Sequence, residues 1–67
     1  MGSKLPIMRW FSYEHLPEHL QRVAEEVAIL AYGMDATLPD GAEKVAGLRK
    51  LLEAKDCFVR AELSKHE

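Results

Sequence analysis

The tetrapeptide Leu38-Pro39-Asp40-Gly41 separates two long stretches in which apolar residues recur every three or four positions. This is the spacing of one face of an α-helix and not the alternation of a β-strand. Proline, aspartate and glycine between the stretches end the first helix and reverse the chain. The sequence therefore predicts an all-α fold, a two-helix antiparallel hairpin with helices at about 17–38 and 42–64. In the first helix the apolar stripe comprises Leu16, Leu20, Val23, Val27, Leu30, Met34 and Leu38.

The remaining residues lie at the two ends of this hairpin. We expect a hairpin domain at 9–64, a flexible leader or expression tag at 1–8, and a short tail at 65–67. Met8 is a second plausible start, and Gly2-Ser3 resembles a cloning scar. Pro17 suits the first position of a helix, which supports the predicted beginning of the first one.

A chain of 67 residues with a single cysteine, Cys57, has no disulfide to stabilise it. Domains of this size bury little surface and usually need a crosslink or a partner. Ile29, Tyr32 and Ala36 form a second apolar side of the first helix, nearly opposite the stripe. These residues predict a subunit interface, and hence assembly of the hairpins into a homo-oligomeric helical bundle.

The segment RWFSYEHLP, residues 9–17, forms an aromatic N-terminal arm that contains Trp10, Phe11 and Tyr13. The arm has two interpretations: an apolar plug that packs on a neighbouring hairpin, or a stacking surface for a planar ligand with Arg9 beside it. Residue type alone favours the plug. We expect Phe11 to be buried at the oligomer interface, because its ring has no polar atom. Tyr13 should be partly exposed over a pocket, because its hydroxyl needs a polar partner.

Lys55 falls in the middle of the apolar arc of the second helix. Its stem could pack along the core while the ammonium pairs with Glu26 or Glu62, which residue type favours. Alternatively, Lys55 could hold a phosphate in a pocket between subunits. Arg49 and Arg60 share another side of the helix. Each guanidinium is either solvated or forms a bidentate contact with a phosphate. The candidate ligand-binding residues are therefore Arg9, Trp10, Tyr13, Arg49, Lys55 and Arg60.

Several function classes are disfavoured by composition and motifs. A net charge of −2 argues against general DNA or RNA binding, which normally needs a basic surplus. We find no apolar run that could span a bilayer and no secretory signal, so we expect no membrane partner and a cytoplasmic location.

Enzymatic and metal sites are also disfavoured. His15 and His19 are four residues apart, but Pro17 lies between them and no third ligand is near, so we expect no metal. Neither Cys57 nor Ser12 has the neighbours of a catalytic nucleophile, and the sequence contains no glycine-rich phosphate loop. We therefore expect a binding protein without cofactors that is not an enzyme.

Two motifs resemble a known family. Tyr13-Glu14-His15-Leu16-Pro17-Glu18 begins the first helix, and Phe58-Val59-Arg60-Ala61 closes the second. Over roughly residues 10–62 the chain resembles the short helical-hairpin sponges that phages use against the CBASS and Thoeris immune systems. The resemblance implies a compact oligomer in the host bacterial cytoplasm that sequesters cyclic oligonucleotide or related nucleotide signals without cleaving them. It also implies base stacking by Tyr13 and a polar ligand contact by Arg60.

One departure from that family concerns the phosphate site. The sponges resemble one another in having a phosphate-binding lysine on the first helix, where this chain has only Arg22 as a cation. Lys55 or Arg49 would have to replace it. The alternative function is a small homo-oligomeric structural or adaptor protein that binds a protein partner through its helical groove.

Overall fold

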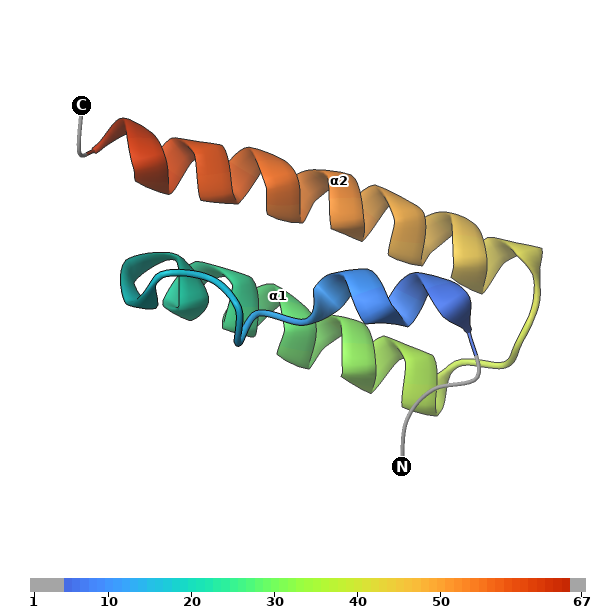
Figure 1. Ribbon diagram of the computed structural model, residues 1–67. Helices are drawn as coiled ribbons and strands as arrows, with labels where there is room; N and C mark the ends of the chain where they lie inside the picture. Colours follow the sequence, from blue (N-terminus) through green and yellow to red (C-terminus); the bar gives the residue numbers. More distant parts are fainter. Residues whose placement is uncertain (1–4, 66–67) are drawn as a thin grey trace.

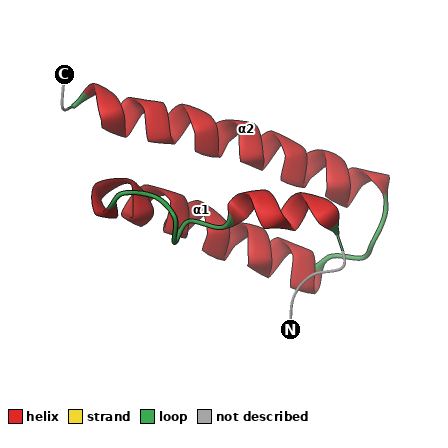
Figure 2. Ribbon diagram, in the orientation of Figure 1, coloured by secondary structure: helices red, strands yellow, loops and turns green. Residues whose placement is uncertain are grey.

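The computed structural model describes residues 5–65 and contains three helical elements. They are a 3-10 helix η1 (Pro6–Phe11) and two α-helices, α1 (Glu18–Thr37) and α2 (Ala42–Ser64). Figures 1 and 2 show α1 and α2 packed side by side and antiparallel, with no strand in the described part of the chain. The predicted hairpin is confirmed, and both helices begin and end within one residue of the predicted positions.

The hinge between α1 and α2 follows from its residue types. Leu38 precedes a proline and is extended (φ −94°, ψ 148°), because the proline ring disfavours helical geometry in the preceding residue. Gly41 has φ 156° and ψ 176°, a conformation that is essentially restricted to glycine. The Lys44 ammonium joins the two sides of the hinge, since its Nζ lies 3.1 Å from Asp35 Oδ1 and 2.7 Å from Asp40 Oδ1.

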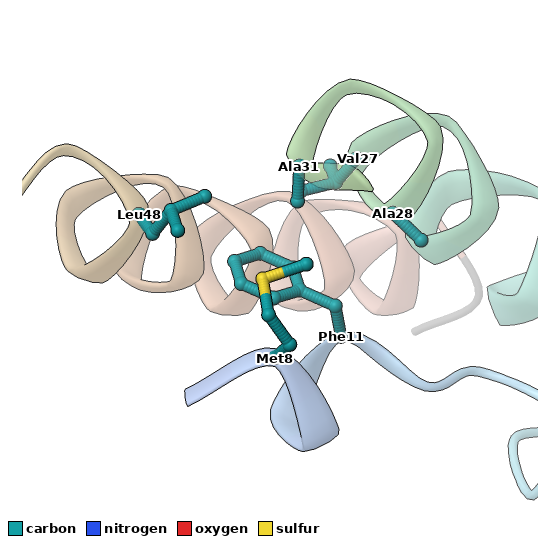
Figure 3. Packing of buried hydrophobic residues seen from close by; sticks show 6 residues of the cluster. All are labelled: Met8, Phe11, Val27, Ala28, Ala31 and Leu48. Atoms are coloured by element: carbon teal, nitrogen blue, oxygen red, sulfur yellow. The ribbon is translucent and has the colours of Figure 1, made fainter. Parts of the chain in front are cut away.

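η1 lies along the hairpin and contacts both α-helices (Figure 1). In Figure 3 the Met8 and Phe11 side chains point from η1 toward the two helices. Phe11 is 0% exposed, and no other large side chain in the described part of the chain is as completely buried. The buried cluster consists of Met8, Phe11, Val27, Ala28, Ala31 and Leu48.

This packing corrects two predictions. Phe11 is buried by helices of its own chain, so its assignment to the oligomer interface is wrong for this structure. The leader predicted at residues 1–8 is wrong for residues 5–8, because Leu5 and Met8 pack in or against the core. Residues 1–4 of that leader, and residues 66–67 of the predicted tail, lie outside the described part of the chain.

The face by which α1 joins the core also differs from the predicted stripe. Leu30, Met34 and Leu38 are exposed, and α1 instead buries a face rich in alanine. The reason is the ring of Phe11: alanine methyl groups leave space for it against α1, whereas leucine and methionine side chains there would overfill the same space. The residues that α1 buries are Leu20, Ala24, Val27, Ala28 and Ala31.

The packing side of α2 is unusually polar for so small a protein. Its buried residues are Lys44, Leu48, Lys55 and Glu62, three of which carry charge. Each charged group has a partner. Lys44 pairs with Asp35 at the hinge, Lys55 donates to a backbone carbonyl at the end of η1, and Glu62 pairs with Lys65 Nζ at 3.2 Å. Buried charges are tolerated when they are paired in this way.

Candidate functional site

A pocket of about 400 Å³ lies where the end of η1 and the loop after it meet the middle of α2. This volume falls within the range of small-molecule sites, roughly 300–1,000 Å³. Three of the six predicted ligand-binding residues, Arg9, Trp10 and Lys55, line it together. The complete lining is Arg9, Trp10, Ser12, His15, Leu52, Lys55 and Asp56. We call this site the arm pocket.

Lys55 is the cation that α2 contributes to the arm pocket. The residue is only 8% exposed, and its Nζ donates a hydrogen bond to the Trp10 carbonyl oxygen at 2.5 Å. The predicted carboxylate partners, Glu26 and Glu62, are wrong. Lys55 faces the last turn of η1, where backbone carbonyls lack helical N–H partners, and it satisfies one of them.

The lysine ammonium retains unused hydrogen-bond donors. It has three N–H groups, and the Trp10 carbonyl accepts one. Within residues 5–65 no carboxylate forms an ion pair with it, and no second acceptor bonds to it. Two donors of a largely buried cation are therefore free to bind a ligand in the arm pocket.

Arg9 and Trp10 form the wall of the pocket that η1 contributes. The Arg9 guanidinium carbon lies 5.0 Å from the centroid of the Trp10 ring, within the range of a cation–π interaction. Trp10 is 57% exposed, which is high for the largest apolar side chain in the protein. The wall thus presents a broad aromatic surface with a positive charge beside it.

The other polar residues of the arm pocket were not predicted as ligand-binding. Asp56 adds one carboxylate to a lining that also holds two cations, Arg9 and Lys55, so the lining keeps a positive balance. Leu52 lies three residues before Lys55, so helical spacing alone could have placed it beside the lysine. Asp56 follows Lys55 directly and projects from another side of the helix, so spacing could not have placed it there. Ser12 and His15 belong to the loop, whose path no spacing rule predicts.

Tyr13 lies elsewhere, against the buried cluster on the α1 side. Hydrogen bonding to Glu25, and then the negative charge of that carboxylate, raise the pKa of Tyr13 above its usual 10.0. The side chain is partly buried, as expected, but it does not line the arm pocket. Its phenol ring is therefore not the stacking surface in this conformation.

Arg49 and Arg60 are both exposed on α2 and do not line the arm pocket. The Arg60 Nη2 donates instead to Cys57 Sγ at 3.4 Å. Ile29, Tyr32 and Ala36 are exposed on α1, and their role at a subunit interface stays a prediction.

A second depression of about 270 Å³ lies between α1 and α2 near the hinge. Its lining is mainly apolar, and none of the lining residues in the described part of the chain comes from η1. We call it the hairpin groove. It is lined by Leu30, Met34, Leu38, Glu43, Lys44, Gly47, Leu48 and Leu51.

Within residues 5–65, no three His, Cys, Asp or Glu side chains gather closely enough to hold a metal ion. None of the helices described there is long and apolar enough to cross a membrane.

No known family model, curated protein or solved structure matches this chain.

Proposed function

We propose that this protein binds and sequesters a small anionic nucleotide signal, and that the arm pocket is the binding site. The observation that carries the proposal is the Lys55 ammonium, largely buried, with two unused donors on the wall of a pocket that also holds Arg9 and Trp10. A ligand with negative charge and a planar group complements this lining, and a nucleotide has both.

Each pocket wall has a part in this binding. The phosphate accepts hydrogen bonds from Lys55 and pairs with Arg9, because charge-assisted bonds to phosphate are strong. The base stacks on Trp10, an interaction worth roughly 1–3 kcal/mol per base. A pocket of about 400 Å³ lies near the lower end of the small-molecule range, which suits one nucleotide unit of a larger signal.

Sequestration without cleavage fits the arrangement of Ser12 and His15. Both line the arm pocket, yet within residues 5–65 no hydrogen bond joins them and no third group orients the imidazole. Nucleophilic catalysis needs a nucleophile and base in contact, with the base held in place. The resemblance to phage hairpin sponges extends the proposal to cyclic oligonucleotide immune signals, a homo-oligomer and the host bacterial cytoplasm.

Calorimetry against a panel of cyclic di- and trinucleotides tests the proposal. Wild-type protein should bind at least one of them, and chromatography should recover the nucleotide intact. Lys55→Met keeps the stem but removes the charge, and should weaken binding at least tenfold, or about 1.4 kcal/mol. Lys50→Met is the matched control, because Lys50 is exposed on α2 and does not line the arm pocket. Absence of heat with every nucleotide, or equal affinity for the two variants, would overturn the proposal.

The hairpin groove favours a second candidate function. Its apolar lining is typical of a surface that binds an amphipathic helix, so an adaptor protein would use the groove and leave the arm pocket without a ligand. A protein that binds no nucleotide of the panel but binds a helical peptide in the groove would favour the adaptor.

A further inference from the structure

We infer that a second copy of this chain covers the hairpin groove, so that two hairpins pack groove to groove as a four-helix core. The inference rests on the homo-oligomer proposed above and identifies the surface that forms it. It does not depend on the nucleotide.

The exposed apolar surface of the groove continues along α2 beyond the lining residues. Phe58 lies seven residues after Leu51, about two turns further along the same side of α2. Leu30 on α1 is 50% exposed and Phe58 is 52% exposed, although both are large apolar side chains. An apolar surface contributed by two adjacent helices is larger than scattered single residues would make, and marks an interaction site.

The core of the single chain is too small to offset the free-energy cost of this exposed apolar surface. η1 covers one side of the hairpin with Met8 and Phe11, while the groove receives no residue of η1 in the described part of the chain. Three of the eight buried apolar residues are alanines, and Phe11 is the one large side chain among those described that is fully enclosed. A chain of 67 residues without a disulfide needs additional burial, which a second copy provides at the groove.

The size of the molecule suits such a dimer. Its principal extents are 41 × 22 × 16 Å, so one long side covers roughly 650–900 Å². Stable protein interfaces bury about 800 Å² on each partner. One long side is therefore about as large as each half of such an interface, with the hairpin groove at its hinge end and Phe58 further along α2.

Charges at the two ends of α2 favour a second copy over an unrelated helix. Glu43 lines the groove at its hinge end, and Lys65 lies 22 residues later, six turns along and about 40° around α2. A two-fold axis perpendicular to the helices brings Glu43 of one copy toward Lys65 of the other, twice. Lys65 Nζ pairs with Glu62 of its own copy at 3.2 Å, but its side chain is 68% exposed, so the same ammonium can reach a second carboxylate, as Lys44 does at the hinge.

Analytical ultracentrifugation of two neighbouring variants tests the inference. Wild-type protein at about 50 μM, in reducing buffer because Cys57 is exposed, should sediment as a dimer or larger. Leu30→Glu should sediment with at most half the wild-type mass, because it places a charge in the groove. Ile29→Glu makes the same chemical change on the side of α1 away from the groove, and at least a dimer should remain. A wild-type monomer, or a Leu30→Glu variant with the mass of the wild type, would overturn the inference.

Two further measurements guard against a variant that simply unfolds. Phe58→Asp places the charge on α2 and must also reduce the mass to at most half that of the wild type, with helix content followed by circular dichroism. If either variant loses its helices, dilution of the wild type decides: a dimer predicts a Tm that falls on dilution, and a constant Tm overturns the inference. A monomer that binds nucleotide would refute this inference alone, whereas a dimer that binds none would refute only the proposed function.

Discussion

The Lys55 side chain and the Trp10 backbone are joined by a hydrogen bond across 45 residues of sequence, with Nζ donating to the carbonyl oxygen at 2.5 Å. This bond connects α2 to the last turn of η1. The same ammonium group lines the arm pocket, so one side chain both holds the end of the arm and provides positive charge in the pocket. Under the proposed function, ligand binding and the position of the arm should therefore be coupled.

Replacing Lys55 with methionine should loosen the end of η1 without unfolding the hairpin. The substitution retains most of the apolar stem but leaves the Trp10 carbonyl without its donor. We expect acrylamide to quench Trp10 fluorescence more strongly in Lys55→Met than in the wild type, while circular dichroism shows unchanged helix content. In Lys50→Met, acrylamide should quench Trp10 fluorescence as strongly as in the wild type. Equal quenching in all three proteins would contradict the coupling.

Phe11 and Trp10 are adjacent in η1 but should respond in opposite ways to truncation. Phe11→Ala removes a completely buried ring and should cost about 3–5 kcal/mol of unfolding free energy, a large part of the 5–15 kcal/mol typical of a domain. Trp10→Ala should cost less than about 1 kcal/mol, because the indole is mostly exposed, yet it should weaken nucleotide binding. Urea unfolding measures the first effect and calorimetry the second.

Phe11→Leu provides the check on that comparison. It retains an apolar side chain of comparable size and should cost less than about 2 kcal/mol. Equal stability of Phe11→Ala and Trp10→Ala would show that η1 does not pack as described.

Tyr13 should ionise at a higher pH in the folded protein than in the unfolded chain. Hydrogen bonding to Glu25 and the charge of that carboxylate raise its pKa above 10.0. The stabilisation is therefore fully present below pH 10 and is lost as the pH rises through the raised folded pKa. A spectrophotometric titration of Tyr32→Phe observes Tyr13 alone, because the chain has two tyrosines. Adding Glu25→Gln should move the midpoint back toward 10.0, and an unmoved midpoint would exclude Glu25 as the cause.

Two glycine-to-alanine substitutions, one in the hinge and one within α1, should have opposite effects on stability. Gly41 has φ 156°, and a side chain there should cost about 1–3 kcal/mol of unfolding free energy. Gly33 lies within α1 with open space around its Cα, so Gly33→Ala should stabilise the protein by up to about 1 kcal/mol. Thermal unfolding should therefore rank the variants Gly33→Ala, wild type, Gly41→Ala in decreasing Tm; the reverse order would contradict the hinge geometry.

The hairpin could be predicted from the sequence because its signals are local. Apolar spacing and the Leu38–Gly41 turn act within a few residues, and they placed both helices correctly. The buried face of α1 could not be predicted in the same way. Hydropathy ranks Leu30 and Met34 above Ala28 and Ala31, but the Phe11 ring, brought from a distant segment, requires the small side chains.

The arm pocket was predictable to the extent that single residues were conspicuous. Lys55 was conspicuous as a charged residue in an apolar arc. Arg9 and Trp10 were conspicuous as a charged residue and a large apolar residue next to each other in sequence. Tyr13 looked equally suitable, but the loop after η1 directs it toward Glu25 on α1. The path of that loop depends on tertiary packing, so sequence spacing could not separate the residues that line the pocket from those that do not.

Trp10 fluorescence tests most directly the central claim that the arm pocket binds a nucleotide. Trp10 is the single tryptophan of the chain and lines this pocket. Titration with cyclic di- and trinucleotides should quench its emission in a saturable way for at least one of them, as a base stacks on the indole. Lys55→Met should shift that curve to at least tenfold higher concentration, and Ile29→Glu should leave it in place. Emission that stays unchanged with every nucleotide up to about 1 mM, a Kd that corresponds to only about 4 kcal/mol of binding free energy, would contradict the claim that the arm pocket binds a nucleotide.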